Sequence, residues 1–161
     1  INGDTIKVSY LEEEEIITAI DEEKIVRVIL ILLSNSIKFS KEKGDICVEM
    51  RREDEEVVIK VTDNGIGINE DMKEKIFDKF KRVQSVSNLN VDHEGSGLGL
   101  YIAKGFIELH NGSISVVSEV EKGSTFIITI PIVIIKNDLH NIKHMDEDEL
   151  NRIIKIELSD L

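Results

Sequence analysis

A chain of 161 residues is long enough for one compact domain with a tail. Its composition, 41% hydrophobic and 32% charged, is typical of a globular protein and too apolar for a disordered one. The formal net charge of −12 would repel nucleic acid and anionic lipid, so any site for a small polyanion must be local, built from backbone N–H groups and a few cations.

The first predicted helix covers about residues 22–39. Before it, residues 6–20 contain two short extended stretches around an acidic run, to which no chemistry is assigned. From Asp21, which can cap a helix, side chains of one face recur at helical spacing. The residues of this face are Ile25, Val28, Ile29, Leu32 and Ser36.

A second edge of this helix carries Ile31, Asn35 and Lys38, which are spaced i, i+4 and i+7. The amide oxygen of Asn35 is a hard ligand that suits Mg²⁺, and the ammonium of Lys38 can reach phosphates that the ion bridges. The alternative is an ordinary solvated helix edge, which an isolated Asn and Lys favour.

Residues 46–50 and 57–61 alternate in hydropathy and predict a β-hairpin. The alternation places Asp63 on the apolar face, where a carboxylate needs a partner. The segment Asp63-Asn64-Gly65-Ile66-Gly67-Ile68 follows the second strand. Its glycines allow a sharp turn and a close approach to a planar ligand, while Asp63 can accept a hydrogen bond from an exocyclic amine such as adenine N6. A plain turn is the alternative.

Residues 71–80 indicate one or two short helices, and the polar, aperiodic stretch 81–96 predicts a mobile loop. The loop leads into Gly95-Ser96-Gly97-Leu98-Gly99-Leu100, directly before a helix that stops at Asn111-Gly112. Glycines at a helix N-terminus offer a phosphate free N–H groups and the positive end of the helix dipole. The segment matches neither the dinucleotide motif nor a P-loop.

Two more strands are predicted at about 113–119 and 124–131. Thr125, near the start of the second strand, can support Asp63 by a direct or water-mediated hydrogen bond. From Val133 onward the tail fits a late strand, a helix or a disordered segment.

Five segments in this order resemble the N, G1, F, G2 and G3 boxes of histidine kinase catalytic domains, and their order and spacing match over roughly residues 20–132. The segments are Asn35–Ser40, Asp63–Ile68, Ile76–Phe80, Gly95–Leu100 and Gly123–Phe126. The resemblance implies an α/β (α+β) two-layer sandwich of the Bergerat type. Such a fold has a mixed, mostly antiparallel sheet, about three helices on one face and a flexible ATP lid, here at about 81–97. It implies a catalytic domain over 1–132 and an acidic tail of unknown structure over 133–161.

The same resemblance assigns residues to ATP and Mg²⁺. Asp63 would bind the adenine amine, Phe39 would lie against the adenine, and Thr125 would sit behind Asp63. Asn35 would coordinate Mg²⁺ and Lys38 would contact phosphate. The remaining ATP-binding residues that the resemblance implies are Gly65, Ile66, Gly67, Ile68, Lys81, Arg82, Gly95, Ser96, Gly97, Leu98, Gly99 and Leu100.

Ile31 departs from the related families. ATPases such as gyrase and the large heat-shock chaperones have a glutamate at this position, one turn before the Mg²⁺-binding asparagine, and the kinases usually have an asparagine. An isoleucine cannot accept a proton, which disfavours hydrolysis of ATP by activated water. The substitution leaves reduced activity or a nucleotide-sensing role open.

The resemblance implies an enzyme, an ATP-dependent protein-histidine kinase. It would bind ATP with Mg²⁺ and transfer the γ-phosphate to a histidine on a separate dimerisation domain, with a response regulator downstream in a two-component system. The alternatives are a non-catalytic ATP-sensing module and an ATPase of the same superfamily. The net charge of −12 predicts no nucleic-acid partner, and we expect no direct membrane contact by this domain.

The acceptor histidine is expected to lie outside this chain. His93 lies in the loop before Gly95, not on a dimerisation helix, and His110 ends a helix, where it can interact with the dipole. His140 and His144 lie in the tail without the other ligands of a metal site. We therefore expect a fragment that lacks the dimerisation domain and does not phosphorylate itself.

The expected location is cytoplasmic, within a membrane-anchored sensor protein. The longest apolar run, Val28 to Leu33, is six residues and too short to span a bilayer. The single cysteine, Cys47, excludes an intramolecular disulfide and favours an intracellular location.

Overall fold

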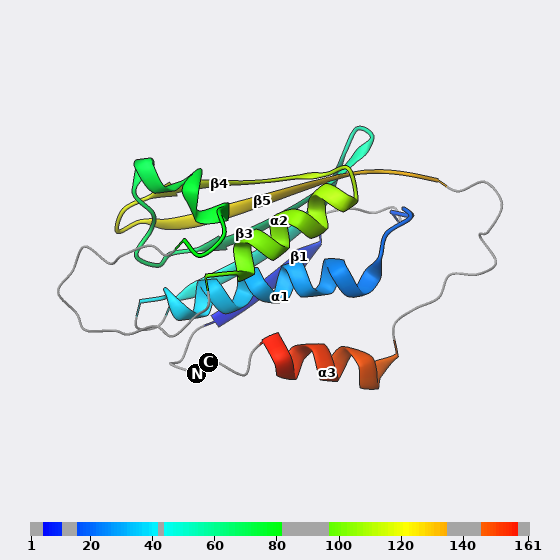
Figure 1. Cartoon of the computed structure of the whole chain (residues 1–161), viewed down its shortest axis with the longest axis horizontal. Coiled ribbons are helices and arrows are strands. Elements are labelled where there is room, and N and C mark those ends of the chain that lie inside the picture. The colour runs from blue at the N-terminus through cyan, green and yellow to red at the C-terminus, as the bar shows by residue number, and fades with distance from the viewer. Residues whose placement is uncertain (1–4, 11–15, 42–43, 82–96, 135–145, 158–161) are drawn as a thin grey trace.

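A five-stranded sheet carries the helices on one of its faces (Figure 1). The computed structural model describes residues 5–10, 16–41, 44–81, 97–134 and 146–157. The strands are β1 (Thr5–Tyr10), β2 (Asp45–Glu53), β3 (Glu56–Asp63), β4 (Ser113–Glu119) and β5 (Gly123–Pro131). They lie in the order β1-β2-β3-β5-β4, with β1 parallel to β2 and every other pair antiparallel. The prediction of a mixed, mostly antiparallel sheet is confirmed.

The hairpin β2–β3 forms where hydropathy alternates in the sequence. Val48 pairs with Val61 and Met50 with Ile59, so one face of both strands is apolar. Ile46 pairs with Asp63, which places this carboxylate at the end of the apolar face as predicted. The second extended stretch expected before residue 20 is not a strand; residues 16–20 have no regular structure, and Ala19 N–H donates to the Val133 carbonyl at 2.9 Å.

Two antiparallel helices cover the inner face of the sheet. Helix α1 (Glu22–Lys38) begins at Asp21, whose carboxylate accepts a hydrogen bond from Lys24 N at 3.1 Å. Helix α2 (Gly99–Leu109) runs the opposite way. Its last residues reach the start of α1, where His110 Nε2 accepts a hydrogen bond from Asp21 N at 2.9 Å. The start of α2 lies beside the second half of α1.

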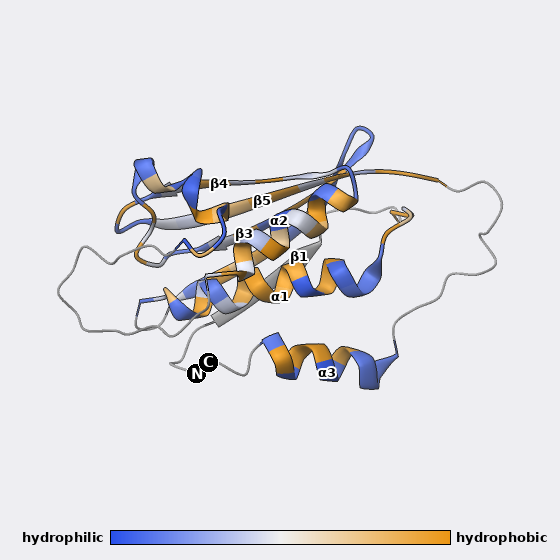
Figure 2. Ribbon diagram, viewed as in Figure 1, coloured by the Kyte–Doolittle hydropathy of each residue, from blue (hydrophilic) through white to orange (hydrophobic). Residues whose placement is uncertain are grey.

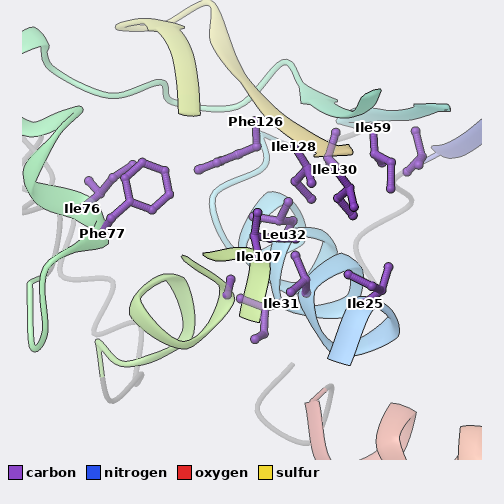
Figure 3. Packing of buried hydrophobic residues seen from close by; sticks show 14 of the residues in the cluster. Ile25, Ile31, Leu32, Ile59, Ile76, Phe77, Ile107, Phe126, Ile128 and Ile130 are labelled. Atoms are coloured by element: carbon purple, nitrogen blue, oxygen red, sulfur yellow. The ribbon is translucent and has the colours of Figure 1, made fainter. Parts of the chain in front are cut away.

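The core between helices and sheet is almost entirely aliphatic, as the lack of tryptophan predicts (Figure 3). Two short 3₁₀ turns, η1 (Glu70–Met72) and η2 (Lys75–Phe77), match the short helices expected in this stretch. Phe77 in η2 packs edge-on against Phe126 of β5, with ring centroids 6.4 Å apart. This contact holds η2 against β5 of the sheet.

A third helix lies in the tail, whose structure the sequence left open. Helix α3 (Glu147–Glu157) packs against α1 on the side away from α2 (Figures 1 and 3). Apolar and polar residues alternate along it (Figure 2), and Ile153 is 1% exposed. Within the described ranges, each helix is too short or too polar to span a membrane.

Candidate nucleotide-binding site

Asp63 is the centre of the site, at the last residue of β3. Its side chain is only 8% exposed. Oδ1 accepts hydrogen bonds from Gly65 N at 2.9 Å and Ser124 N at 3.2 Å, and Oδ2 accepts one from Ser36 Oγ at 3.4 Å. The predicted partner of the buried carboxylate is therefore a set of three donors from three segments of the chain.

Burial raises the pKa of the Asp63 carboxyl above its ordinary value, because a charged group is less stable away from water. The hydrogen bonds from Gly65, Ser124 and Ser36 act in the opposite direction and lower that pKa. The result is a desolvated acceptor whose orientation is fixed by backbone donors.

The turn after Asp63 is held tightly by its neighbours, and its glycines are required. A Cβ on Gly65 would lie 2.3 Å from the Phe39 carbonyl oxygen, and Gly67 has φ +72° with a Cβ position 2.1 Å from the Glu119 carbonyl oxygen. Ile66 N–H donates to the same Phe39 carbonyl at 3.1 Å. Ile68, the last residue of the segment, is 9% exposed. The turn thus joins the end of α1 to the β4–β5 hairpin.

The β4–β5 hairpin docks on this turn through its own tight bend. Glu121 N–H donates to the Ile66 carbonyl at 2.7 Å, and Ser118 Oγ accepts from Ile68 N at 2.8 Å. Gly123 has φ +104° and would place a Cβ 2.0 Å from the Asp63 carbonyl oxygen. Two turns from distant parts of the sequence therefore interlock around Asp63.

Thr125, expected to support Asp63 by a direct or water-mediated hydrogen bond, makes a different contact. Its hydroxyl lies 3.1 Å from that of Thr62, its partner across the β3–β5 ladder. Since side chains alternate along a strand, Thr125 and Thr62 point to the face opposite Asp63. Ser124, directly paired with Asp63, takes the expected place.

Asn35, Lys38 and Phe39 lie at the end of α1, within one helix turn of Ser36, a partner of Asp63. All three side chains are half-buried. Ile31, one turn earlier, is 6% exposed and belongs to the core, and its Cγ2 is 3.2 Å from the Cβ position of Gly99. The predicted edge of Ile31, Asn35 and Lys38 therefore meets the start of α2 at Ile31.

Of the segment predicted to bind phosphate, Gly95–Leu100, the structure describes Gly97 and the residues after it. Gly97 has φ +68°, and its carbonyl accepts a hydrogen bond from Phe80 N at 3.1 Å. Apolar Leu98 occupies the N-cap of α2, so no N-cap side chain competes for the first amides of the helix. Gly99 and Leu100 open the helix. Lys81 is exposed directly after Phe80.

Several sequence predictions lie outside the described residues. They are Arg82, Gly95 and Ser96 of the site, most of the loop expected at 81–97, and His93, His140 and His144. His110, expected to interact with the helix dipole, is the C-cap of α2 and also bridges two helices: Nδ1 lies 2.7 Å from the Phe106 carbonyl oxygen while Nε2 accepts from Asp21 N.

Sequence reasoning missed Ser36 and Ser124 as partners of Asp63. The sequence contains a signal for each of these two serines. Ser36 is a polar residue on the apolar stripe of α1, and Ser124 has the same strand parity as buried Phe126. A polar residue at a core-facing position near a buried carboxylate marks a hydrogen-bond partner.

The chain matches the family described as histidine kinase-, DNA gyrase B- and HSP90-like ATPase over residues 20–134. It is 39% identical over 132 residues to the sensor protein RprX of Bacteroides fragilis, which covers 81% of this chain and 25% of RprX. It is 37% identical over 123 residues to the sensor histidine kinase WalK of Bacillus subtilis, covering 75% of this chain and 20% of WalK. The chain thus spans a quarter or less of these relatives.

Solved structures of histidine kinases are also similar to this chain. The catalytic domain of histidine kinase ThkA superposes with a TM-score of 0.68 at 27% identity, covering 81% of this chain and 82% of that one. ThkA has also been solved with the response regulator TrrA (TM-score 0.64, 26% identity, 82% and 35% covered). Full-length ShkA in complex with AMPPNP gives a TM-score of 0.67 at 26% identity, covering 83% and 27%.

The matched range includes Asp63, its glycine turn, the end of α1 and the start of α2. The chain therefore belongs to the histidine kinase-, DNA gyrase B- and HSP90-like ATPase family, as a catalytic ATP-binding domain of the sensor histidine kinase type.

Proposed function

We propose that this chain binds Mg·ATP around Asp63 and transfers the γ-phosphate to a histidine on a separate dimerisation domain. The observation that carries the proposal is the buried Asp63 carboxylate, held by Gly65, Ser124 and Ser36, the last of these in the final turn of α1. A buried carboxylate with acceptor capacity left over is suited to a ligand that donates a hydrogen bond.

The adenine amine is the donor that fits Asp63. Two backbone amides occupy Oδ1, while Oδ2 receives only the long Ser36 bond among the described contacts. A carboxylate offers about four acceptor positions, so Oδ2 retains room for an exocyclic amine. Gly65 and Gly67 add no side chain at their own positions in the adjoining turn, and Ile66 and Ile68 belong to the same turn. Phe39 lies next to this turn, because its carbonyl accepts a hydrogen bond from Ile66 N.

The triphosphate belongs at the start of α2. The amides of Gly97, Leu98, Gly99 and Leu100 lie at the positive end of the helix dipole. Lys38 from α1 supplies a cation, with Lys81, Arg82, Gly95 and Ser96 as further phosphate contacts carried over from the family.

Mg²⁺ fits as an ion brought in with the nucleotide. Within the described ranges, no group of three or more His, Cys, Asp or Glu side chains could hold a metal. Asn35 would supply one amide oxygen, and phosphate oxygens and water would supply the other ligands, which is the usual pattern for Mg²⁺ bound with a nucleotide. The bound ion would neutralise phosphate charge.

Catalysis in this scheme is mostly positioning and charge neutralisation. Ile31 is buried against the start of α2 and cannot act as a base toward water. This disfavours the ATPase alternative.

The partner proposed for phosphotransfer is the histidine-bearing domain, with a response regulator further downstream. ThkA was solved with the response regulator TrrA, which supports the response regulator by similarity. ShkA was solved with AMPPNP, which supports the nucleotide by similarity. Helix α2 begins at the proposed phosphate site and exposes Tyr101, Ile102 and Leu109 by 48, 40 and 70%. We assign this apolar stripe to the histidine-bearing domain because it continues from the phosphate site along one helix.

The domain organisation belongs to the same proposal. The catalytic unit covers 1–132 with a lid at about 81–97, and the tail 133–161 carries α3. The whole protein is proposed to be a membrane-anchored sensor with this domain in the cytoplasm.

The test supplies the histidine-bearing domain in trans with labelled ATP. The expected product is protein-bound phosphate that is labile to acid and stable to base. Nucleotide binding without any phosphate transfer would overturn the kinase assignment and favour the alternative of a non-catalytic ATP-sensing module. Steady release of phosphate without an acceptor protein would instead indicate an ATPase.

Substitution of Asp63 tests the adenine assignment. Asp63→Asn places an amide donor where the adenine amine needs an acceptor, so we expect ADP affinity to fall at least about tenfold. The matched control is Asp54→Asn, at an exposed hairpin position with φ 53° that Asn also tolerates. Calorimetry measures both; equal affinity in the Asp63 variant and the control contradicts the assignment.

A further inference from the structure

Ser118, near the end of β4, lies outside all five motif segments and links both turns of the site. Its hydroxyl accepts a hydrogen bond from Ile68 N at 2.8 Å and donates one to the Gly123 carbonyl at 2.8 Å. It also lies 3.0 Å from Ser124 Oγ. Three groups from two distant turns therefore meet at one oxygen.

The hydrogen-bond capacity of this hydroxyl is fully used. A serine hydroxyl has one donor and two acceptor positions. The donor goes to Gly123, and one acceptor takes Ile68 N–H, which leaves the other acceptor for the Ser124 hydroxyl.

The contacts of Ser118 lead directly to Asp63. Ser124, its partner in the β4–β5 ladder, donates its backbone N–H to Asp63 Oδ1. Gly123 packs against the Asp63 carbonyl, and Ile68 ends the turn that begins at Asp63. A shift of the Ser118 contacts would therefore move the donor that orients the carboxylate.

We propose that Ser118 is a positioning residue that sets the preference of the site for adenine. This inference rests on the proposed function, since it concerns the same nucleotide. Ser118 touches neither the base nor the phosphates in the scheme. It holds the two turns in the register in which Asp63 Oδ2 faces the exocyclic amine.

The measurement is the ratio of affinities for ADP and IDP with Mg²⁺, by calorimetry on the full chain. IDP carries a carbonyl where ADP has the amine, so the ratio reports the bond to Asp63 and not the phosphate contacts. Ser118→Ala removes the three contacts and is expected to lower the ADP-to-IDP ratio about tenfold, the equivalent of one hydrogen bond. IDP affinity itself should change little.

Three further variants separate positioning from general damage. Ser115→Ala is the matched control, because Ser115 is an exposed serine on the other face of β4; its ratio should equal that of the unaltered chain. Ser118→Thr keeps the hydroxyl and should restore most of the ratio. Ser124→Ala removes only the Ser118–Ser124 contact and should lower the ratio by less than Ser118→Ala does; it also provides a readout if Ser118→Ala does not fold.

An unchanged ratio in Ser118→Ala, or in Ser124→Ala where the first variant does not fold, overturns the inference. An equal loss of ADP and IDP affinity does so as well, because it indicates loss of structure and not of base selection. If the unaltered chain binds neither nucleotide, the proposed function fails first. The two failures are thus distinguishable.

Discussion

At the scale of single residues, the site depends on a carboxylate in a place that disfavours its charge. Asp63 is 8% exposed, and burial is the largest cause of its raised pKa. Backbone donors from Gly65 and Ser124 offset part of this effect without adding charge. The arrangement spends folding stability on an acceptor that a ligand can use.

The raised pKa predicts a particular dependence of stability on pH. In the unfolded chain the carboxyl loses its proton near pH 3.8, and in the folded chain it does so at higher pH. Between these two values the folded state binds more protons, so the free energy of unfolding should fall as pH rises through this window. Above the window this group adds no further pH dependence, and the loss of stability remains in full.

Urea unfolding at a series of pH values, compared between the unaltered chain and Asp63→Asn, measures this contribution. As pH rises through the window, the unaltered chain should lose stability relative to Asp63→Asn. A difference that grows in favour of the unaltered chain as pH rises would contradict the assigned shift.

Gly67 and Gly105 predict opposite results for the same substitution. Gly67→Ala adds a methyl group 2.1 Å from the Glu119 carbonyl oxygen at φ +72°, so it should destabilise the fold by about 2 to 3 kcal/mol. At Gly105, inside α2, an added Cβ would meet no atom of another element within 4 Å among the described residues, so Gly105→Ala should stabilise the helix by about 0.5 to 1 kcal/mol. Denaturant unfolding gives both values, and similar effects of the two substitutions would contradict the strain at Gly67.

At the scale of elements, the apolar surface of α1 accounts for the presence of a third helix. Six consecutive apolar residues, Val28 to Leu33, cover more than one turn of 3.6 residues, so the sheet and α2 cannot bury all of them. Helix α3 packs on the side of α1 away from α2. The family match ends at residue 134, before α3 begins.

Ile153 tests how firmly α3 is docked. Truncation of a buried isoleucine to alanine costs about 2 to 5 kcal/mol. An 11-residue helix is marginal alone, so it can detach, and the loss cannot exceed its docking free energy. We therefore expect Ile153→Ala to increase hydrogen exchange in 147–157 while the melting temperature of the domain changes little. Ile156→Ala, at a side chain 56% exposed, should leave the exchange unchanged; equal exchange in both variants would refute the docked helix.

At the scale of the whole molecule, the net charge of −12 opposes any polyanion, so the affinity for a nucleotide must come from local groups. The start of α2, Lys38 and the bound Mg²⁺ are those groups in the proposed function. Their effect depends on the ends of two helices and one strand meeting at one end of the sheet.

This predicts that nucleotide stabilises the folded chain only together with the metal. At 100 times the dissociation constant, Mg·ADP should add about 2.7 kcal/mol to the free energy of unfolding. For a chain of this size that raises the melting temperature by roughly 5 to 10 °C. Calorimetric melting with ADP, with and without EDTA, measures it. A rise of the same size in EDTA would contradict the role of Mg²⁺.

The sequence by itself determined those features that depend on near neighbours. Helical spacing predicted α1, alternation predicted β2 and β3, and glycines before α2 predicted its start, because periodicity and backbone freedom are local properties. The order of the five motif segments identified the family. Even the inward direction of Asp63 followed from its strand parity.

Only the tertiary structure decided the contacts between distant segments. Asp63 receives donors from 27 and 61 residues away, and the sequence favoured Thr125 where the ladder placed Ser124. Strand β1 pairs in parallel with β2, and α3 docks on α1. Each of these depends on register and packing across the whole chain, which a local pattern does not contain because many distant pairings satisfy the same periodicity.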